Sequence, residues 1–360
     1  MSYVEHGGLA APPGPLLCED ATLWAFLVRA DSRQLARECK RVLEIPSNRA
    51  VRVYPLLPAV LLIFARLGTV TSTTCPYTLV GHVPEQEVAV FVPVVVRTRR
   101  GPRVMPAPRR RFPPRIGSLA RVRFAAFITY MFLDNPMSIA AGREIYGYPK
   151  NWGWPTFADE PPEKHQGPFT TPRPKDVSLG SLALDAFAIP SFSPDATPDR
   201  HRLLTLTPDE EQTSRSGVAL ESPLAAADWM REQVYGTAGR GRRLRAAILK
   251  RLEARLPPIT VNQLFIRQLR AAGGGLGADH QDVLTAPATI KRGSWRHAGS
   301  LPAYDVQINE LASHRIGYRL GIRSGPTIAA FKAQFDFTVG AATTLWKAPE
   351  PGLLRHRRRR

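Results

Sequence analysis

Five apolar segments rich in β-forming residues follow one another toward the C-terminus, with no helical pattern between them. They cover residues 259–269, 283–290, 304–311, 316–322 and 335–339. Consecutive strands of this kind favour an antiparallel arrangement, whereas a doubly wound fold alternates strands with helices. The sequence therefore predicts an α+β fold, in which a mainly antiparallel sheet closes into a barrel-like structure with a few helices.

The N-terminal half is predicted to add strands around one short helix. The predicted strands cover residues 22–29, 59–67, 87–97 and 122–133. Asp31 precedes the helix, and Gln34 follows three residues later, which resembles a capping box. The helix must end before Pro46, because proline cannot continue it. A strand, a helix and further strands in this order fit the same α+β fold.

We expect a single domain over residues 1–354 with two insertions. The first is an Arg/Pro-rich loop at 97–115, and the second is a loop-rich insertion at 158–257. Two helical patterns lie inside the second insertion, at 223–235 and 240–256. The last residues, 355–360, form an Arg-rich tail that we expect to be disordered, because like charges repel and nothing apolar is available to bury.

The chain is strongly basic, with 49 Lys+Arg against 30 Asp+Glu and a net charge of +19. Arginine clusters of this kind can bind nucleic acid, an anionic membrane or acidic substrates. None of them is interleaved with aromatic residues at a spacing that reads nucleic acid, and no docking motif is present. We therefore expect a solvated basic surface and no specific nucleic-acid partner. One further hypothesis places the 97–115 loop over the mouth of a pocket.

Several other classes of protein are disfavoured by the sequence. Cys18, Cys39 and Cys75 form no paired spacing, which argues against a disulfide framework. The most apolar window, 53–70, is interrupted by prolines and is too short to span a membrane. No signal peptide, metal-ligand pairing, phosphate-binding loop or nucleophile elbow is present. We expect a cytoplasmic protein without a metal or an organic cofactor.

One lysine occupies an unusual setting in a chain that has only eight lysines. Asp134 or Asn135 can cap a short helix that begins at Pro136 and ends at Gly147, and Lys150 follows in an extended segment. A lysine can lose its proton and attack a carbonyl carbon, whereas an arginine effectively cannot. Burial among apolar side chains favours the neutral amine. Lys150 is therefore a candidate nucleophile.

The region around Lys150 resembles the acetoacetate decarboxylase family. The resemblance is carried by four short stretches: Met131-Phe132-Leu133-Asp134, Ala141-Gly142-Arg143-Glu144, Tyr148-Pro149-Lys150 and Gly153-Trp154-Pro155. It implies that Lys150 forms a Schiff base with a small β-keto acid and that the protonated imine accepts the electrons released with CO₂. It also implies a homo-oligomer. Related family members use the same lysine for aldol, dehydration or cyclisation reactions.

The resemblance assigns further site residues and also shows departures. Glu87, with Glu85 as its close rival, matches the family's pocket carboxylate that orients the substrate or carries a proton. Asn151 stands where the founding enzyme has a second lysine. The family's N-terminal arginine falls near Ala21, and its next carboxylate falls within the apolar run 60–65. Acetoacetate itself is therefore doubtful as the substrate.

The remaining candidates have structural alternatives. Tyr148, Trp152 and Trp154 would form apolar walls of a pocket around the lysine, or they pack in the core. Arg143 and Glu144 are substrate-pocket candidates, although a structural ion pair is the simpler interpretation. Decarboxylation is the predicted activity, and aldolase or dehydratase chemistry is the enzymatic alternative. A noncatalytic binding or scaffold protein that kept the fold is another alternative, and an arginine-driven nucleic-acid or membrane associate is the third.

Overall fold

A computed structural model describes most of the predicted domain. The described residues are 13–79, 81–98, 121–157, 180–209, 225, 229, 232, 260–270 and 278–348. The predicted Arg/Pro loop beyond Thr98, most of the second insertion and the Arg-rich tail lie outside them. In the first helical pattern of that insertion, the three described residues are helical.

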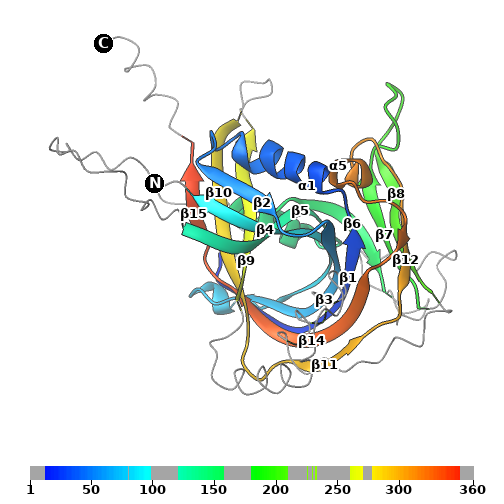
Figure 1. The fold of residues 1–360 in the computed structure, drawn as a ribbon. Helices are drawn as coiled ribbons and strands as arrows, with labels where there is room; N and C mark the ends of the chain where they lie inside the picture. The colour runs from blue at the N-terminus through cyan, green and yellow to red at the C-terminus, as the bar shows by residue number, and fades with distance from the viewer. Residues whose placement is uncertain are drawn as a thin grey trace, which may run out of the picture.

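Seven strands form a closed ring, because β4 pairs with β5 in addition to its other neighbour (Figure 1). In ring order they are β5 (Arg121–Leu133), β9 (Thr260–Arg270), β10 (Ala278–Ile290), β14 (Ala329–Val339), β1 (Leu16–Arg29), β3 (Ala59–Ser72) and β4 (Val83–Thr98). Every pairing in the ring is antiparallel except the short one between β5 and β9. The predicted mainly antiparallel α+β fold is confirmed.

Further strands extend the sheet beyond the ring. β6 (Lys150–Thr156) runs parallel to β5 and leads outward to four short strands, of which β7, β8 and β12 are seen beside the ring in Figure 1. These four are β7 (Leu182–Ala188), β8 (Asp199–Pro208), β12 (Tyr304–Ile308) and β13 (Gly325–Pro326). The others are β2 (Val51–Pro55) beside β4, β11 (Arg296–Ser300) beside β14 and β15 (Thr343–Lys347) beside β10.

The first helix forms as its sequence indicates. α1 (Ser32–Cys39) is capped by Asp31, whose side chain accepts a hydrogen bond from the Gln34 backbone N–H at 2.8 Å. A π-helical segment, η1 (Lys40–Glu44), continues it, and the buried Leu35, Cys39 and Leu43 attach both to the core. The other helical segment described before β4 is a single 3₁₀ turn, η2 (Tyr77–Leu79). None of the described helices has the length and apolar character needed to cross a membrane.

One prediction of local structure was wrong. Residues 316–322 were predicted as a strand, but they contain the short helix α5 (Ile316–Leu320), in which Ile316 and Leu320 are buried four residues apart on one face. Within the predicted loop-rich insertion 158–257, the structure also shows the strand β7, which is buried almost throughout. A short apolar run has no clear period, so tertiary contacts decide what it becomes.

The two largest of four clusters of buried side chains are an inner and an outer cluster around the ring. All seven ring strands contribute to the inner cluster, which includes Cys18, Ala65, Ala89, Met131 and Phe265. The outer, larger cluster joins the other face of the strands to α1, β2, β7, β8 and β12. The strands therefore present one face to the ring interior and pack the opposite face against the surrounding elements.

Candidate active site inside the strand ring

The strand register places Lys150 in the ring interior together with two glutamates. Ala89, Met131 and Lys150 are successive register partners across β4, β5 and β6. Glu85 and Glu87 precede Ala89 by four and two residues on β4, and side chains two apart on a strand share a face. Lys150, Glu85 and Glu87 thus come from one face of three neighbouring strands.

A capped helix lies beside these carboxylates. α2 (Pro136–Ala141) begins after Asn135, whose side chain accepts hydrogen bonds from the backbone N–H groups of Met137 and Ser138. The side-chain amide of Asn135 also donates to the Pro84 carbonyl at 3.2 Å, which ties the helix to the start of β4. The predicted cap therefore has a second function, because it holds Ser138 next to the glutamate-bearing strand.

The turn that leads to Lys150 is held by β9. A π-helical segment, η3 (Gly142–Tyr146), follows α2 and ends at Gly147, whose φ of 79° lies in the left-handed region that favours glycine. A Cβ at Gly147 would lie 2.5 Å from Arg267, so the turn contacts the β9 backbone directly. Arg267 donates to the Ile145 carbonyl at 3.2 Å, and Tyr148 donates to Gln263 at 2.5 Å.

The amine of Lys150 is enclosed and paired with a carboxylate. Lys150 is 7% exposed, and its Nζ lies 3.0 Å from Glu85 Oε1 and 3.4 Å from Ser138 Oγ. Its side chain passes over Gly142, where a Cβ would lie 2.6 Å from both Lys150 Cδ and Cε. Glycine at position 142 therefore provides the space through which the lysine reaches the carboxylate.

The two glutamates differ in their protonation. Burial opposes ionisation of Glu85, but Lys150 and a hydrogen bond from Ser138 outweigh it and hold the pKa of Glu85 below its usual value. Burial, followed by the negative charge of Glu85, raises the pKa of Glu87 to about 8. At neutral pH the pair therefore holds one carboxylate, at Glu85, and one protonated carboxyl group, at Glu87.

Residues 48–171 match the sequence profile of the acetoacetate decarboxylase (ADC) family, and this segment contains both glutamates and Lys150. The matched segment covers about a third of the chain and is similar to that family. No curated protein matches its sequence significantly.

One solved structure supports a shared fold at a TM-score above 0.5, and two others are similar at lower scores. Acetoacetate decarboxylase from Legionella pneumophila subsp. pneumophila strain Philadelphia 1 is 14% identical, with a TM-score of 0.51 and coverage of 96% of this chain and 93% of that one. A second acetoacetate decarboxylase is 13% identical, with a TM-score of 0.49 and coverage of 94% and 92%. The enduracididine biosynthesis enzyme MppR, in complex with pyruvate, is 13% identical, with a TM-score of 0.48 and coverage of 92% and 91%.

Two small apolar side chains are buried on the strands beside the glutamates. Ala21 and Ala65 are each at most 1% exposed, and both belong to the inner cluster. Ala65 is the register partner of Glu87, and Ala21 pairs with Leu67, which in turn pairs with Glu85. Small apolar side chains therefore stand beside the two glutamates.

Two other groups face the glutamates from neighbouring strands. The thiol of Cys18 and the phenol of Tyr148 are buried, and burial raises the pKa of each, with the glutamates adding to the effect. The Lys150 Nζ lies 5.7 Å from the centroid of the Tyr148 ring. Both groups are therefore neutral near the site, and Tyr148 forms one wall beside the amine, as the sequence predicted.

Asn151 and Trp152 do not take part in the cluster around the amine. The Asn151 amide donates to the Pro149 carbonyl at 2.9 Å and to the Met131 carbonyl at 3.5 Å, so it supports the backbone that carries Lys150. Trp152 lies beyond the ring, is 42% exposed, and contacts the rings of Trp154 and Phe187. β6 leaves the ring after Lys150, which the sequence alone did not indicate.

Five predicted site residues line one cleft of about 1310 Å³: Arg143, Glu144, Tyr148, Lys150 and Asn151. Arg143 and Glu144 themselves are exposed. Ser138 and Gly142 contact the amine, whereas Ile139 and Arg143, one position further along the helical segment in each case, line the cleft. Adjacent positions of the helical segment therefore face the amine and the cleft, and Lys150 itself also lines the cleft.

Sequence reasoning missed Ser138 and ranked the glutamates in the other order. Glu85 is the carboxylate that contacts Lys150, and Glu87 lies next to it. A signal for Ser138 was available, because it precedes Gly142 by four residues and so shares its helical face. Within the described part of the chain, no three metal-ligating side chains come together.

Proposed function

We propose that this protein is a lyase that acts on a small keto acid through a Schiff base at Lys150, with decarboxylation as the reaction. The observation that supports this most directly is the enclosed amine of Lys150, 3.0 Å from Glu85. An amine must lose its proton before it attacks a carbonyl carbon, and Glu85 is the adjacent base. The imine itself is the electron sink, so the proposed reaction uses no cofactor or metal.

In the proposed reaction each proton has a defined destination. Glu85 takes a proton from the Lys150 ammonium, and the nitrogen then bonds to the ketone carbon of the substrate. The nitrogen passes one of its protons to the ketone oxygen, which becomes a hydroxyl group. Glu85 then gives its proton to this hydroxyl group, which leaves as water, so that the protonated imine stands opposite the Glu85 carboxylate. The bond to the substrate carboxylate then breaks, CO₂ leaves and its electron pair moves into the imine. Glu87 is the second proposed catalytic group.

The substrate is proposed to be a keto acid other than acetoacetate, because the family's charged partners for the substrate carboxylate align near Ala21 and within the apolar run 60–65. Aldolase or dehydratase chemistry at the same lysine is the alternative. These apolar positions and Asn151 also favour a second candidate, a noncatalytic binding protein that kept the fold. As expected from the sequence, the protein is proposed to be a cytoplasmic homo-oligomer.

Reductive trapping tests the proposal. The protein is incubated with acetoacetate, pyruvate and longer keto acids, reduced with borohydride and digested for mass spectrometry. We expect a covalent adduct on the peptide that contains Lys150 and its loss in Lys150→Arg. Lys291→Arg, at an exposed lysine that also pairs with a glutamate, is the matched control and should keep the adduct. If no keto acid in the panel modifies Lys150, the noncatalytic candidate replaces the enzyme.

A further inference from the structure

Ser138 connects the amine to the carboxylate pair. Its hydroxyl donates a hydrogen bond to Glu85 Oε2, and its oxygen accepts one from Lys150 Nζ at 3.4 Å. Lys150 also donates to the other carboxylate oxygen, Glu85 Oε1, at 3.0 Å. Both oxygens of Glu85 therefore accept hydrogen bonds, one from a cation and one from a hydroxyl group, and this arrangement favours the ionised form.

Glu87 has a different environment, although it lies beside Glu85. The two side chains are two residues apart on the same face of β4, and the charge of Glu85 helps to raise the pKa of Glu87. Two adjacent carboxylates cannot both ionise at low cost in a buried site. Because Glu85 already receives donors from Lys150 and Ser138, it is the better place for the charge. The remaining titratable groups that face the pair, Cys18 and Tyr148, are both neutral.

We propose that Ser138 is a positioning residue that fixes the negative charge on Glu85 and so keeps the shared proton of the pair on Glu87, where it can be delivered to substrate carbon. The position of the proton deepens the proposed function and rests on it only for the delivery step. The two glutamates, which sequence alone could not rank, then have different roles. Glu85 exchanges protons with nitrogen, and Glu87 delivers a proton to the substrate carbon.

The delivery step balances. After CO₂ has left, the electron pair of the broken carbon–carbon bond is held in the enamine formed at Lys150. The O–H bond of Glu87 breaks, a C–H bond forms at the enamine carbon, and the nitrogen becomes a protonated imine again. Glu87 is left as a carboxylate and regains a proton from water. Hydrolysis of the imine then releases the ketone and the Lys150 amine.

The position of Ser138 depends on the helix cap rather than on the lysine motif. It is the third residue of α2, and its backbone N–H donates to the side chain of Asn135 at 3.3 Å. Since Asn135 also holds Pro84, the hydroxyl and Glu85 are fixed relative to one another by backbone contacts. Ser138→Thr keeps a hydroxyl at this point, whereas Ser138→Ala removes it without disturbing the cap.

An experiment without substrate tests the proton position. Infrared spectra in D₂O follow the stretching band of a protonated carboxyl group as pH rises. We expect a band that disappears near pH 8 in the wild type and is missing at neutral pH in Glu87→Gln. Ser138→Ala should move the midpoint upward by about one pH unit, the size of one hydrogen bond to a charged group, because the proton can then reside on Glu85. Ser138→Thr should restore it.

The same variants are then tested with a keto acid that modifies Lys150. The rate of product release should fall above about pH 8 in the wild type, and this limb should move with the infrared midpoint in Ser138→Ala. Ser324→Ala, which removes a hydroxyl that contacts the Ile308 backbone N–H, is the control and should leave both unchanged.

The outcomes separate the two proposals. If the wild type forms no adduct but the infrared band behaves as expected, the lyase assignment fails and the positioning role of Ser138 stands. If Ser138→Ala leaves the infrared midpoint and the pH limb at their wild-type values, the positioning role is overturned even if Lys150 is modified. A band that persists in Glu87→Gln would place the proton elsewhere and also overturn it.

Discussion

Two lysine–glutamate pairs in this protein have similar geometry and opposite surroundings. Lys150 and Glu85 lie 3.0 Å apart, with side chains that are 8% and 3% exposed. Lys291 and Glu19 lie 3.3 Å apart, with side chains that are 43% and 46% exposed. Each pair also has a serine nearby, Ser138 inside the ring and Ser294 outside it. Water, rather than distance, is the main difference between them.

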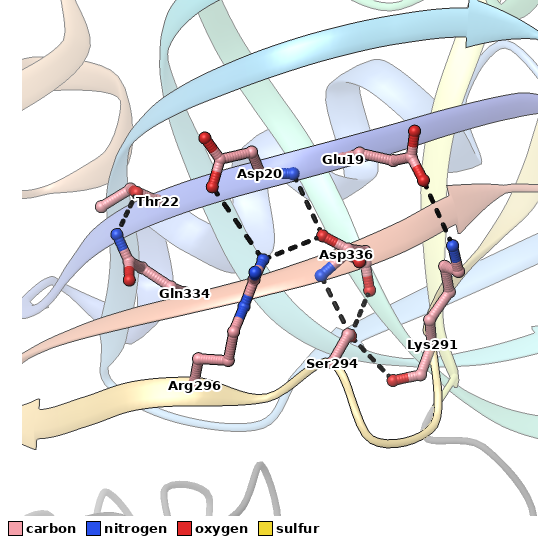
Figure 2. Close-up of polar contacts among 8 residues, drawn as sticks. All are labelled: Glu19, Asp20, Thr22, Lys291, Ser294, Arg296, Gln334 and Asp336. Carbon is pink, nitrogen blue, oxygen red and sulfur yellow. Dashed lines mark hydrogen bonds and ion pairs between the residues drawn. The ribbon is translucent and has the colours of Figure 1, made fainter.

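The surroundings decide what each pair can do. In the outer network, Arg296 and Ser294 contact Asp336 while Lys291 reaches Glu19 (Figure 2), and solvent can replace any of these partners at little cost. Inside the ring no bulk water replaces a lost partner, so each charge depends on the groups around it. Because of this dependence, Glu85 is ionised while Glu87 keeps its proton, and Lys150 is a candidate nucleophile.

The largest expected effect on stability follows from removing the positive charge of Lys150. Lys150→Met leaves Glu85 buried without its partner and should lower the free energy of unfolding by about 3–5 kcal/mol, as measured by urea denaturation. The double variant Lys150→Met/Glu85→Gln should recover part of this loss, because no buried charge remains at the pair. A loss in the single variant below about 1 kcal/mol would mean that water reaches the inner pair.

The second effect is a dependence of stability on pH. Burial raises the pKa of Glu87 from 4.5 to about 8, so the folded protein keeps a proton that the unfolded chain releases. The retained proton of Glu87 therefore adds to the free energy of unfolding fully below pH 4.5. This contribution is lost as pH rises toward 8, by at most about 1.4 kcal/mol per pH unit. Glu85, with its lowered pKa, acts in the opposite sense and loses stability only as pH falls through its pKa.

Urea denaturation between pH 5 and pH 8.5 measures this slope. Glu87→Gln should flatten the slope, whereas Glu19→Gln, a change at the exposed pair, should leave it unaltered. An unchanged slope in Glu87→Gln would show that Glu87 titrates normally and would remove the distinction between the inner and outer carboxylates.

A third effect comes from the space that Gly142 leaves for the lysine. Gly142→Ala places a Cβ 2.6 Å from Lys150 Cδ and should destabilise the protein by about 1–3 kcal/mol while displacing the amine. In a Lys150→Ala background the added methyl group has room, so the cost should disappear. A double-mutant cycle by urea denaturation measures this coupling, and additive effects would contradict the close approach.

The smallest effect is expected at the outer pair. Lys291→Met should change the free energy of unfolding by less than about 1 kcal/mol, and high salt should reduce the difference further. The same salt series on Lys150→Met should leave its loss nearly unchanged, because the inner pair is shielded from ions. Equal salt dependence of the two variants would contradict the difference in burial.

Parts of the site with local causes could be predicted from the sequence. The Asp31 cap, the helix start at Pro136 and the end at Gly147 follow from short-range hydrogen bonds and backbone angles, and all three are confirmed. The motif also identified Lys150, whose burial the structure bears out. The strand at 182–188 and the helix at 316–320 could not be predicted, because short apolar runs take the form that their neighbours impose.

Composition and local spacing alone thus predicted a mainly antiparallel α+β fold and a lysine that follows a capped helix. Tertiary structure decided which glutamate contacts that lysine, that Ser138 joins them, and that Trp152 is exposed. The physical reason is register: a shift of two residues along β4 exchanges Glu85 for Glu87 on the same face. No property of either residue alone carries that information, because it arises from pairing between strands far apart in the chain.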